Sequence, residues 1–304
     1  MTAASPPMTL RPRILCLGAM LWDVIGRSPV RQELGGDHAG IIVQRPGGVA
    51  LNVALALAKN GLSPAILGAV GRDSSGDMLV REAERQGVVC RYLHRDCDGT
   101  DIYMAIEDSL NLVAAVADAR ALEAAGEAIL APLRDGRLGS AKAPFEGMII
   151  LDSNPPAEVL AGFASDPALQ AAVLRIVPAS PSKVARLDPL LTRPRTLFYL
   201  NRAEAEAIAG RPAASSAEAA EAVIARGAER VIVTDGPHPA SEAMRAAPTH
   251  SATPHPVEIR RLTGAGDWLL AAHVKAESAG APRDLALVTA TAAAADYVSG
   301  KDPS

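Results

Sequence analysis

The stretch Leu262-Thr263-Gly264-Ala265-Gly266-Asp267, followed by the apolar run Trp268 to Ala272, decides how the rest of the chain is interpreted. Two glycines and a small alanine allow backbone N–H groups to converge where a helix starts, and the helix dipole favours an anion there. A carboxylate beside a phosphate repels it, so an acid at this position indicates a function. The function that fits is to accept the proton of a hydroxyl that attacks the phosphate. The stretch therefore predicts phosphoryl transfer, although a plain glycine turn with Asp267 as an ordinary helix-start residue fits the same letters.

Length and charge limit the classes of protein that fit. The chain has 304 residues, 49% of them apolar, which suits one large α/β domain or two small ones with a real core. No linker is long enough to split it, so we expect a single domain over residues 1–304. The net charge of -4 is spread along the chain, with no basic stripe for nucleic acid and no polybasic membrane patch. A small molecule is the expected partner.

The lengths of the apolar runs and the number of cysteines indicate where the protein is located and how its thiols behave. Apolar runs stop well short of the ~20 residues that span a bilayer, and residues 1–8 lack the order of a secretory signal, so a cytoplasmic protein is expected. Three cysteines cannot all pair within one chain, and Cys16 lies in an apparent buried strand, so we expect reduced thiols. Cys90, His94 and Cys97 resemble zinc ligands only superficially, because no fourth ligand follows at a familiar spacing.

Several short apolar runs end in polar residues, as strands of a parallel sheet do at their carboxyl ends. Between these runs lie helical stretches of ten to fifteen residues, which indicates a parallel sheet covered on both faces, with ligands gathering beyond the strand ends. The candidate strands and the polar residues after them are 13–17 with Asp23, 148–151 with Asp152, 196–200 with Asn201 and Glu204, and 229–233, the last clear strand, with Thr234 and Gly236.

Other candidates lie between the first strands. Gly47-Gly48 allows the backbone to approach a neighbour closely at the start of an alanine-rich helix, and Asn52, one turn later, could direct its amide to the same place. Alternatively, the glycines only make the turn and Asn52 faces solvent. Residues 24–45 are polar and could form a flap. Residues 88–118 alternate irregularly, with Thr100 and Tyr103 in the stretch, which fits a small two-sided sheet.

Together these residues resemble the PfkB, or ribokinase-like, family of sugar and nucleoside kinases over nearly the whole chain. The motifs occur in the family's order: Gly47-Gly48 with Asn52, Val70-Gly71-Arg72-Asp73 with Gly76, Asn201 with Glu204, Thr234 with Gly236, and Thr263 to Asp267. The resemblance implies a three-layer α/β sandwich around a mainly parallel sheet, with a small β-sheet lid made by segments near 24–45 and 88–118. It also implies ATP and Mg²⁺ as cofactors.

The resemblance assigns roles position by position. Asp267 matches the general base, and Gly264, Ala265 and Gly266 match the anion hole for the transferring phosphate. The nucleotide side is matched by Asn201, Thr234, Gly236 and Gly266, with Glu204 acting indirectly on magnesium. The substrate side is matched by Asp23, Gly47, Gly48 and Asn52. A lid that closes over the site keeps water from the reacting ATP phosphate.

Within the family, three features are similar to pseudouridine kinases: Thr100 with Tyr103, the run 112–118, and Asp152-Ser153-Asn154. They add Thr100, Tyr103 and Asp152 to the expected substrate contacts. Pseudouridine, converted to pseudouridine 5'-phosphate, is the substrate hypothesis; ribokinase-like and adenosine kinase-like activities remain open alternatives.

Two positions depart from the family pattern. Arg261 stands where many members have an acid that belongs to a monovalent-cation site. Its permanent positive charge could take the place of the cation, so that the enzyme requires no potassium. The alternative is that Arg261 turns into solvent. Gly236-Pro237-His238-Pro239 carries two prolines where the family has a second glycine near Pro239, which removes N–H donors from the nucleotide turn.

Two functional classes other than a kinase also have to be considered for this sequence. A non-catalytic nucleoside-binding regulator on the same fold is one, because fold does not fix function. A dinucleotide-dependent oxidoreductase is disfavoured, since no glycine fingerprint follows the first strand. An exposed lid sheet has edges and an apolar face, so a homodimer through the lid is plausible.

Overall fold

The computed structural model describes residues 11–33, 35–109, 112–261 and 263–301. Its centre is an eight-stranded sheet in the order β12-β11-β10-β9-β8-β7-β1-β4. The six strands from β10 to β4 run parallel, and β11 and β12 are antiparallel at one edge. The strands are β1 (Ile14–Leu17), β4 (Pro64–Leu67), β7 (Met148–Asp152), β8 (Val173–Val177), β9 (Thr196–Asn201), β10 (Arg230–Asp235), β11 (His238–Met244) and β12 (Ala247–Ala252).

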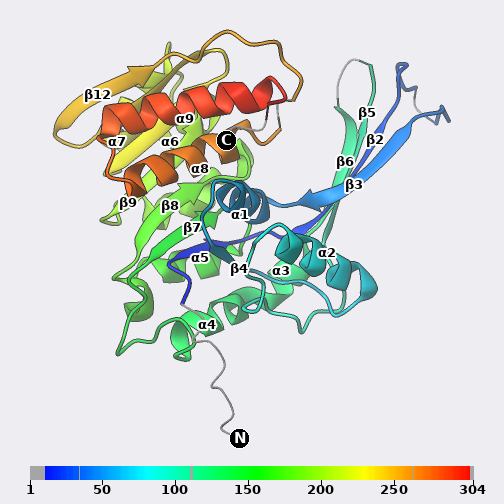
Figure 1. The fold of residues 1–304 in the computed structure, drawn as a ribbon, viewed down its shortest axis with the longest axis horizontal. Helices are drawn as coiled ribbons and strands as arrows, with labels where there is room; N and C mark the ends of the chain where they lie inside the picture. The colour runs from blue at the N-terminus through cyan, green and yellow to red at the C-terminus, as the bar shows by residue number, and fades with distance from the viewer. Residues whose placement is uncertain (1–10, 34, 110–111, 262, 302–304) are drawn as a thin grey trace, which may run out of the picture.

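Helices cover both faces of this sheet (Figure 1). One face carries α1 (Val49–Lys59), α2 (Ser74–Arg85), α8 (Ala265–Ser278) and α9 (Arg283–Val298). The other carries α3 (Arg120–Ala125), α4 (Ala131–Arg134), α5 (Ala157–Phe163), α6 (Arg202–Ala209) and α7 (Ser216–Ala225), with 3₁₀ turns at Gly126–Leu130, Pro167–Leu169 and Pro181–Leu190. Successive strand residues alternate between two buried clusters, as Leu15, Cys16 and Leu17 do, because side chains on a strand point to opposite faces. The three-layer α/β fold is confirmed.

A second, four-stranded sheet projects from the body of the molecule, and we call it the lid (Figure 1). Its order is β3-β2-β5-β6, formed by β2 (Leu21–Arg27), β3 (Ile41–Gly47), β5 (Ile102–Glu107) and β6 (Leu112–Asp118). The strand register places four exposed apolar side chains on one face of the lid. They are Ile42, Met104, Ile106 and Val116.

The structure differs from the sequence-based expectation in two places. The strands β11 and β12 were missed, because their Ala, Ser, Pro and His residues have little β-propensity and pairing at the sheet edge decides their conformation. The lid is also shorter than residues 88–118: Val89 and His94 instead pair with Ala65 and Ala69 beside β4. Within the part of the chain described, no helix is long and apolar enough to cross a membrane.

Asp152 joins three segments at the carboxyl end of β7. Its side chain is 1% exposed and accepts hydrogen bonds from the backbone N–H groups of Ala19 (2.9 Å), Ala50 (3.1 Å) and Asn154 (2.8 Å), and from the Asn154 side-chain amide (3.0 Å). Ala19 follows β1 and Ala50 lies in the first turn of α1. β1 and β7 are neighbours in the sheet, but the next strand of the sheet after β1 lies on one side of this pair and the next strand after β7 lies on the other. Ligands bind at such a point in sheets of this type.

Replacing Asp152 by alanine should lower the free energy of unfolding by about 3 kcal/mol, because the N–H groups of Ala19 and Ala50 would be buried without an acceptor. Urea denaturation measures the change. The exposed Asp188 supplies the matched control, since Asp188→Ala removes a carboxylate from the surface. Equal stabilities of the two variants would contradict a structural role for Asp152.

Candidate active site

Asp267 lies in the first turn of α8, directly after a glycine that permits the helix to start there. Gly264 is the N-cap, with φ at +95°, a conformation that other residues rarely adopt. A side chain at this position would also collide with the Tyr297 hydroxyl, which donates a hydrogen bond to the Thr263 carbonyl (3.0 Å). The N–H groups of the first helical turn have no partner within the helix, so the loop presents donors beside the Asp267 carboxylate.

The environment of Asp267 changes its acidity. Burial raises the pKa of its carboxyl group to about 7, and the negative charge of Asp152 adds to the rise. Burial likewise raises the pKa of Asp152, against the effect of its hydrogen bonds. A carboxylate with a pKa near 7 is suited to accept a proton from a reacting group at neutral pH.

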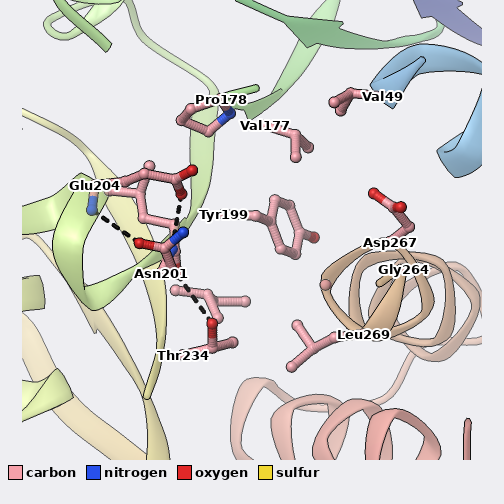
Figure 2. A pocket seen from close by; sticks show the side chains of 13 residues that line it. Val49, Val177, Pro178, Tyr199, Asn201, Glu204, Thr234, Gly264, Asp267 and Leu269 are labelled. Carbon is pink, nitrogen blue, oxygen red and sulfur yellow. Dashed lines mark hydrogen bonds between the residues drawn. The ribbon is translucent and has the colours of Figure 1, made fainter. Parts of the chain in front are cut away.

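The central cavity lies on one side of Asp267 and has a volume of about 250 Å³. Asn201, Glu204 and Thr234, from β9, α6 and β10, line its far wall, and Gly264, Gly266 and Asp267 line the near wall. Figure 2 shows the two groups facing each other across the cavity, with Tyr199 between them. The structure thus brings together residues that are at least 30 positions apart in the sequence.

Asn201 and Glu204 fix each other at the start of α6. The Asn201 side chain accepts a hydrogen bond from the Glu204 N–H, and the Glu204 carboxylate accepts one from the Asn201 N–H, both at 2.9 Å. This capping box holds both side chains at the cavity wall. Burial raises the pKa of Glu204 to about 7.

The apolar cavity adjoins the central one and has a volume of about 540 Å³. The two cavities share Thr234, Gly266 and Leu269. Gly236, with φ at +56°, and Pro237 form a tight turn between β10 and β11 that lines one side, so the two prolines of this segment belong to a hairpin. Apolar side chains line much of the rest, from Val257, Ile259, Ala294 and Val298.

The basic cavity lies on the other side of Asp267 and has a volume of about 300 Å³. It shares Gly264 and Asp267 with the central cavity, so the carboxylate stands between the two. Asn52 lines the basic cavity. Its remaining polar and charged lining consists of Arg45, Lys59, Gln86, Arg261, Thr263, Trp268 and Tyr297.

The lid contributes Asp23, on β2, to the region near the glycine pair. Asp23 pairs in register with Arg45 on β3 and Tyr103 on β5, so the three side chains share one face. The Arg45 guanidinium lies 3.7 Å from the Asp23 carboxylate. Burial raises the pKa of Asp23, and Arg45 opposes the rise. A side chain at Gly47 would collide with Asp23, which explains the glycine.

Two further expected substrate residues are engaged in structural contacts. The Thr100 hydroxyl donates to Asp73 (2.7 Å), which also caps α2 by accepting from the Gly76 N–H (2.6 Å). The Asp152 carboxylate is occupied by the backbone donors described above. The polar atoms of both side chains are thus engaged by protein groups.

Sequence reasoning missed Tyr199, Arg45 and Lys59 as lining residues. Tyr199 stands two residues before Asn201 on a strand, and this spacing was a usable signal because it places both side chains on one face. No comparable signal marked Lys59, which reaches the site only because α1 packs against α8. Among the described residues, no group of three or more His, Cys, Asp or Glu side chains could hold a metal ion.

Arg261 is directed into the protein and binds the end of α9. Its Nε donates to the Tyr297 carbonyl (2.6 Å), and its Nη2 donates to the Lys301 carbonyl (2.7 Å). The guanidinium also lies 4.0 Å from the centre of the Tyr297 ring, and that ring stacks on Trp268 at 5.2 Å. The interpretation that Arg261 turns outward is wrong.

Comparisons with known proteins agree with this architecture. Among solved structures, a carbohydrate kinase from Agrobacterium tumefaciens is 25% identical, with a TM-score of 0.74 over 93% of this chain and 90% of the other. A ribokinase from Arabidopsis thaliana, complexed with ribose and ATP, has a TM-score of 0.79 at 18% identity, covering 95% of this chain and 93% of its own.

The curated relatives match over shorter stretches. An uncharacterized sugar kinase of Escherichia coli, YeiI, is 30% identical over 156 residues, which are 50% of this chain and 41% of that protein. The bifunctional protein HldE of a Marinomonas strain is 49% identical over 55 residues, 18% of this chain and 11% of its own. The model of the pfkB family of carbohydrate kinases matches residues 11–303. The chain therefore belongs to the pfkB carbohydrate kinase family.

Proposed function

We propose that this kinase transfers the γ-phosphoryl group of ATP to a primary hydroxyl of a small sugar or nucleoside. One observation carries the proposal: Asp267 stands at the N-terminus of α8 between two cavities, so it can contact a donor phosphate on one side and an acceptor hydroxyl on the other. The family membership and the sugar-kinase relatives support the same reaction class.

The nucleotide is assigned to the apolar and central cavities. The apolar cavity suits a nucleobase, and the central cavity, bounded by the α8 N-terminus, suits the phosphates. Magnesium is held in such sites by one or two carboxylates together with substrate phosphates. Glu204, whose carboxylate lines the central cavity, fits this donor set, and when bound the ion neutralises phosphate charge.

Asp267 acts on the acceptor. Its carboxylate accepts the hydroxyl proton as the acceptor oxygen attacks the γ-phosphorus and the bond to the ADP oxygen breaks. The N–H groups of Gly264 to Gly266 and the dipole of α8 stabilise negative charge on the phosphoryl oxygens. The lid, which carries Asp23 and Tyr103, covers the acceptor and excludes water.

Pseudouridine is the nucleoside to test first among neutral acceptors. Of the three substrate contacts that these features added, Tyr103 lies on the lid face that carries Asp23, whereas Thr100 and Asp152 are bound to other groups. Its 5'-hydroxyl is a primary hydroxyl of the required kind. Ribokinase-like and adenosine kinase-like acceptors satisfy the same chemistry.

Arg261 is proposed to replace a monovalent cation. A cation bound here would be held by carbonyl oxygens, and the guanidinium already satisfies those of Tyr297 and Lys301. It thereby connects the end of α9 to the residues just before the glycine loop. A second copy of the chain is proposed to cover the apolar lid face, giving a homodimer.

Release of ADP from magnesium-ATP should be detected with at least one member of a panel of pseudouridine, uridine, adenosine, ribose and fructose. Asp267→Asn should reduce kcat by about 10³-fold, because the variant cannot accept the proton while the fold is kept. Binding of ligands without turnover by the unmodified protein would instead favour a non-catalytic regulator. Nearly full turnover by Asp267→Asn would exclude Asp267 as the base.

Asp267 should also make stability depend on pH. Its pKa in the folded state, about 7, exceeds that of an unfolded aspartate, so the free energy of unfolding falls as pH rises from about 4 to 7. Asp267→Asn removes this cost and should be more stable than the unmodified protein by about 2 kcal/mol at pH 8, with little difference at pH 4. Urea denaturation at both pH values measures the gap. A gap that is independent of pH would contradict the raised pKa.

Exchange of sodium for potassium should alter the turnover rate by less than about twofold, because Arg261 supplies a fixed positive charge. Arg261→Ala should lose activity, whereas Arg260→Ala should retain it, since Arg260 is exposed and pairs with Glu258 at the surface. Steady-state rates in the two salts make the comparison. A large activation of the unmodified protein by potassium would contradict the proposal.

A further inference from the structure

We infer that the acceptor is an anionic sugar, and that the basic cavity holds its negatively charged group while a free hydroxyl reaches Asp267. This inference rests on the proposed kinase function and narrows its substrate class. It follows from the positions of the cationic side chains in the cavity and from which part of the two substrates, donor or acceptor, lies beside them.

The lining of the basic cavity carries three cations, Arg45, Lys59 and Arg261, against one acid, Asp267. The chain as a whole has a net charge of -4, so this local excess is opposite in sign to that of the protein. A cleft lined by one sign of charge focuses the electrostatic field and raises the local concentration of ligands of opposite charge.

The positive region continues beyond the cavity. A neighbouring groove of about 450 Å³ shares Arg45 with it and adds Arg81 and Arg85 from α2. The single acid in this groove, Glu82, is paired with Arg85 at 2.6 Å. An anion that approaches the basic cavity through the groove therefore meets a surface of favourable charge.

These cations lie away from the nucleotide. Among the described residues that line the central and apolar cavities there is no lysine or arginine. The donor phosphates are instead provided with helix N–H groups and a carboxylate suited to magnesium. The cations of the basic cavity are thus left for the acceptor.

Lys59 is the cation best placed to bind the acceptor. Arg261 is fixed on the carbonyls of Tyr297 and Lys301, and Arg45 faces Asp23. The Lys59 ammonium makes no ion pair or hydrogen bond with the described part of the chain, and it lies 6.0 Å from the centre of the Trp268 ring.

The distance between Asn52 and Lys59 along α1 limits the size of an acceptor that contacts both. Asn52 and Lys59 are seven residues apart, so both face the same cavity, separated by ~10 Å along the helix axis. Helical side chains lean towards the N-terminus, which brings the ammonium closer to Asn52. With a volume of about 300 Å³, the cavity is at the small end of ligand sites and fits a monosaccharide with one phosphate or carboxylate group.

The reaction leaves this anionic group unchanged. The free hydroxyl oxygen bonds to the γ-phosphorus, the bond between that phosphorus and the ADP oxygen breaks, and the hydroxyl proton passes to Asp267. Bound phosphate or carboxylate oxygens accept hydrogen bonds from Lys59 throughout. Lys59 is therefore a specificity residue, with no part in proton transfer.

The test compares acceptors that differ in charge but keep a free primary hydroxyl. Fructose is the neutral sugar, fructose 1-phosphate and fructose 6-phosphate carry a phosphate at either end, and gluconate carries a carboxylate. Pseudouridine is the neutral nucleoside. We expect kcat/KM for at least one anionic sugar to exceed that of every neutral acceptor by about 30-fold or more, and to fall as salt is added. The phosphate and carboxylate arms decide which anion the cavity accepts.

Lys59→Gln tests the assigned contact. It should raise KM for the anionic acceptor about tenfold, with kcat and the KM for ATP unchanged, because one charge-assisted hydrogen bond is lost. Lys142→Gln is the matched control: Lys142 is exposed and precedes β7, at the opposite end of the sheet from the site. A structural defect would instead affect neutral and anionic acceptors alike.

Binding measured by calorimetry separates the two levels of the inference. Anionic sugars that bind without turnover, with affinity lost in Lys59→Gln, would support the cavity assignment and overturn the kinase function. Turnover that favours neutral acceptors, or an unchanged KM of Lys59→Gln for anionic acceptors, would overturn the inference but would not contradict the proposed kinase function. Absence of both binding and turnover for every anionic sugar would also overturn it.

Discussion

The buried Asp152 carboxylate holds together the segments on which the site is built. It binds the turn after β1 and the first turn of α1, and so fixes the strand that leads into the lid and the helix that carries Asn52. The same negative charge helps to raise the pKa of Asp267. One carboxylate therefore supports the architecture and also tunes the acidity of the residue proposed to carry out the chemistry.

The site separates its charges in space. Carboxylates and helix N–H groups face the central cavity, where a metal and phosphates are proposed, while cations face the basic cavity. In the wall of the basic cavity, Arg261, Tyr297 and Trp268 form a stack, and the Tyr297 hydroxyl donates a hydrogen bond to the Thr263 carbonyl in the glycine loop. Because the loop is braced by protein groups, its N–H donors are arranged before a ligand arrives, which is the condition for effective stabilisation of a transition state.

Much of the fold and part of the site could be predicted from residue patterns. Apolar runs ending in Asp152, Asn201 and Thr234 indicated a parallel sheet, and the structure places these residues at one end of it. The glycine motif located the start of α8. The antiparallel edge strands and the true length of the lid could not be predicted, because pairing with neighbouring strands determines them more than local propensity does.

The sequence by itself determined the fold class and the family resemblance, and it pointed to Asp267 as the candidate base, because these depend on periodicity and on short motifs whose spacing is local. Only the tertiary structure decided that Asn52 faces a cavity, that Thr100 and Asp152 are engaged elsewhere, and that Arg261 turns inward. It also decided that Lys59 lies beside the site. Those outcomes depend on the packing of α1 against α8 and of α8 against α9, contacts between segments far apart in the chain that no local pattern encodes.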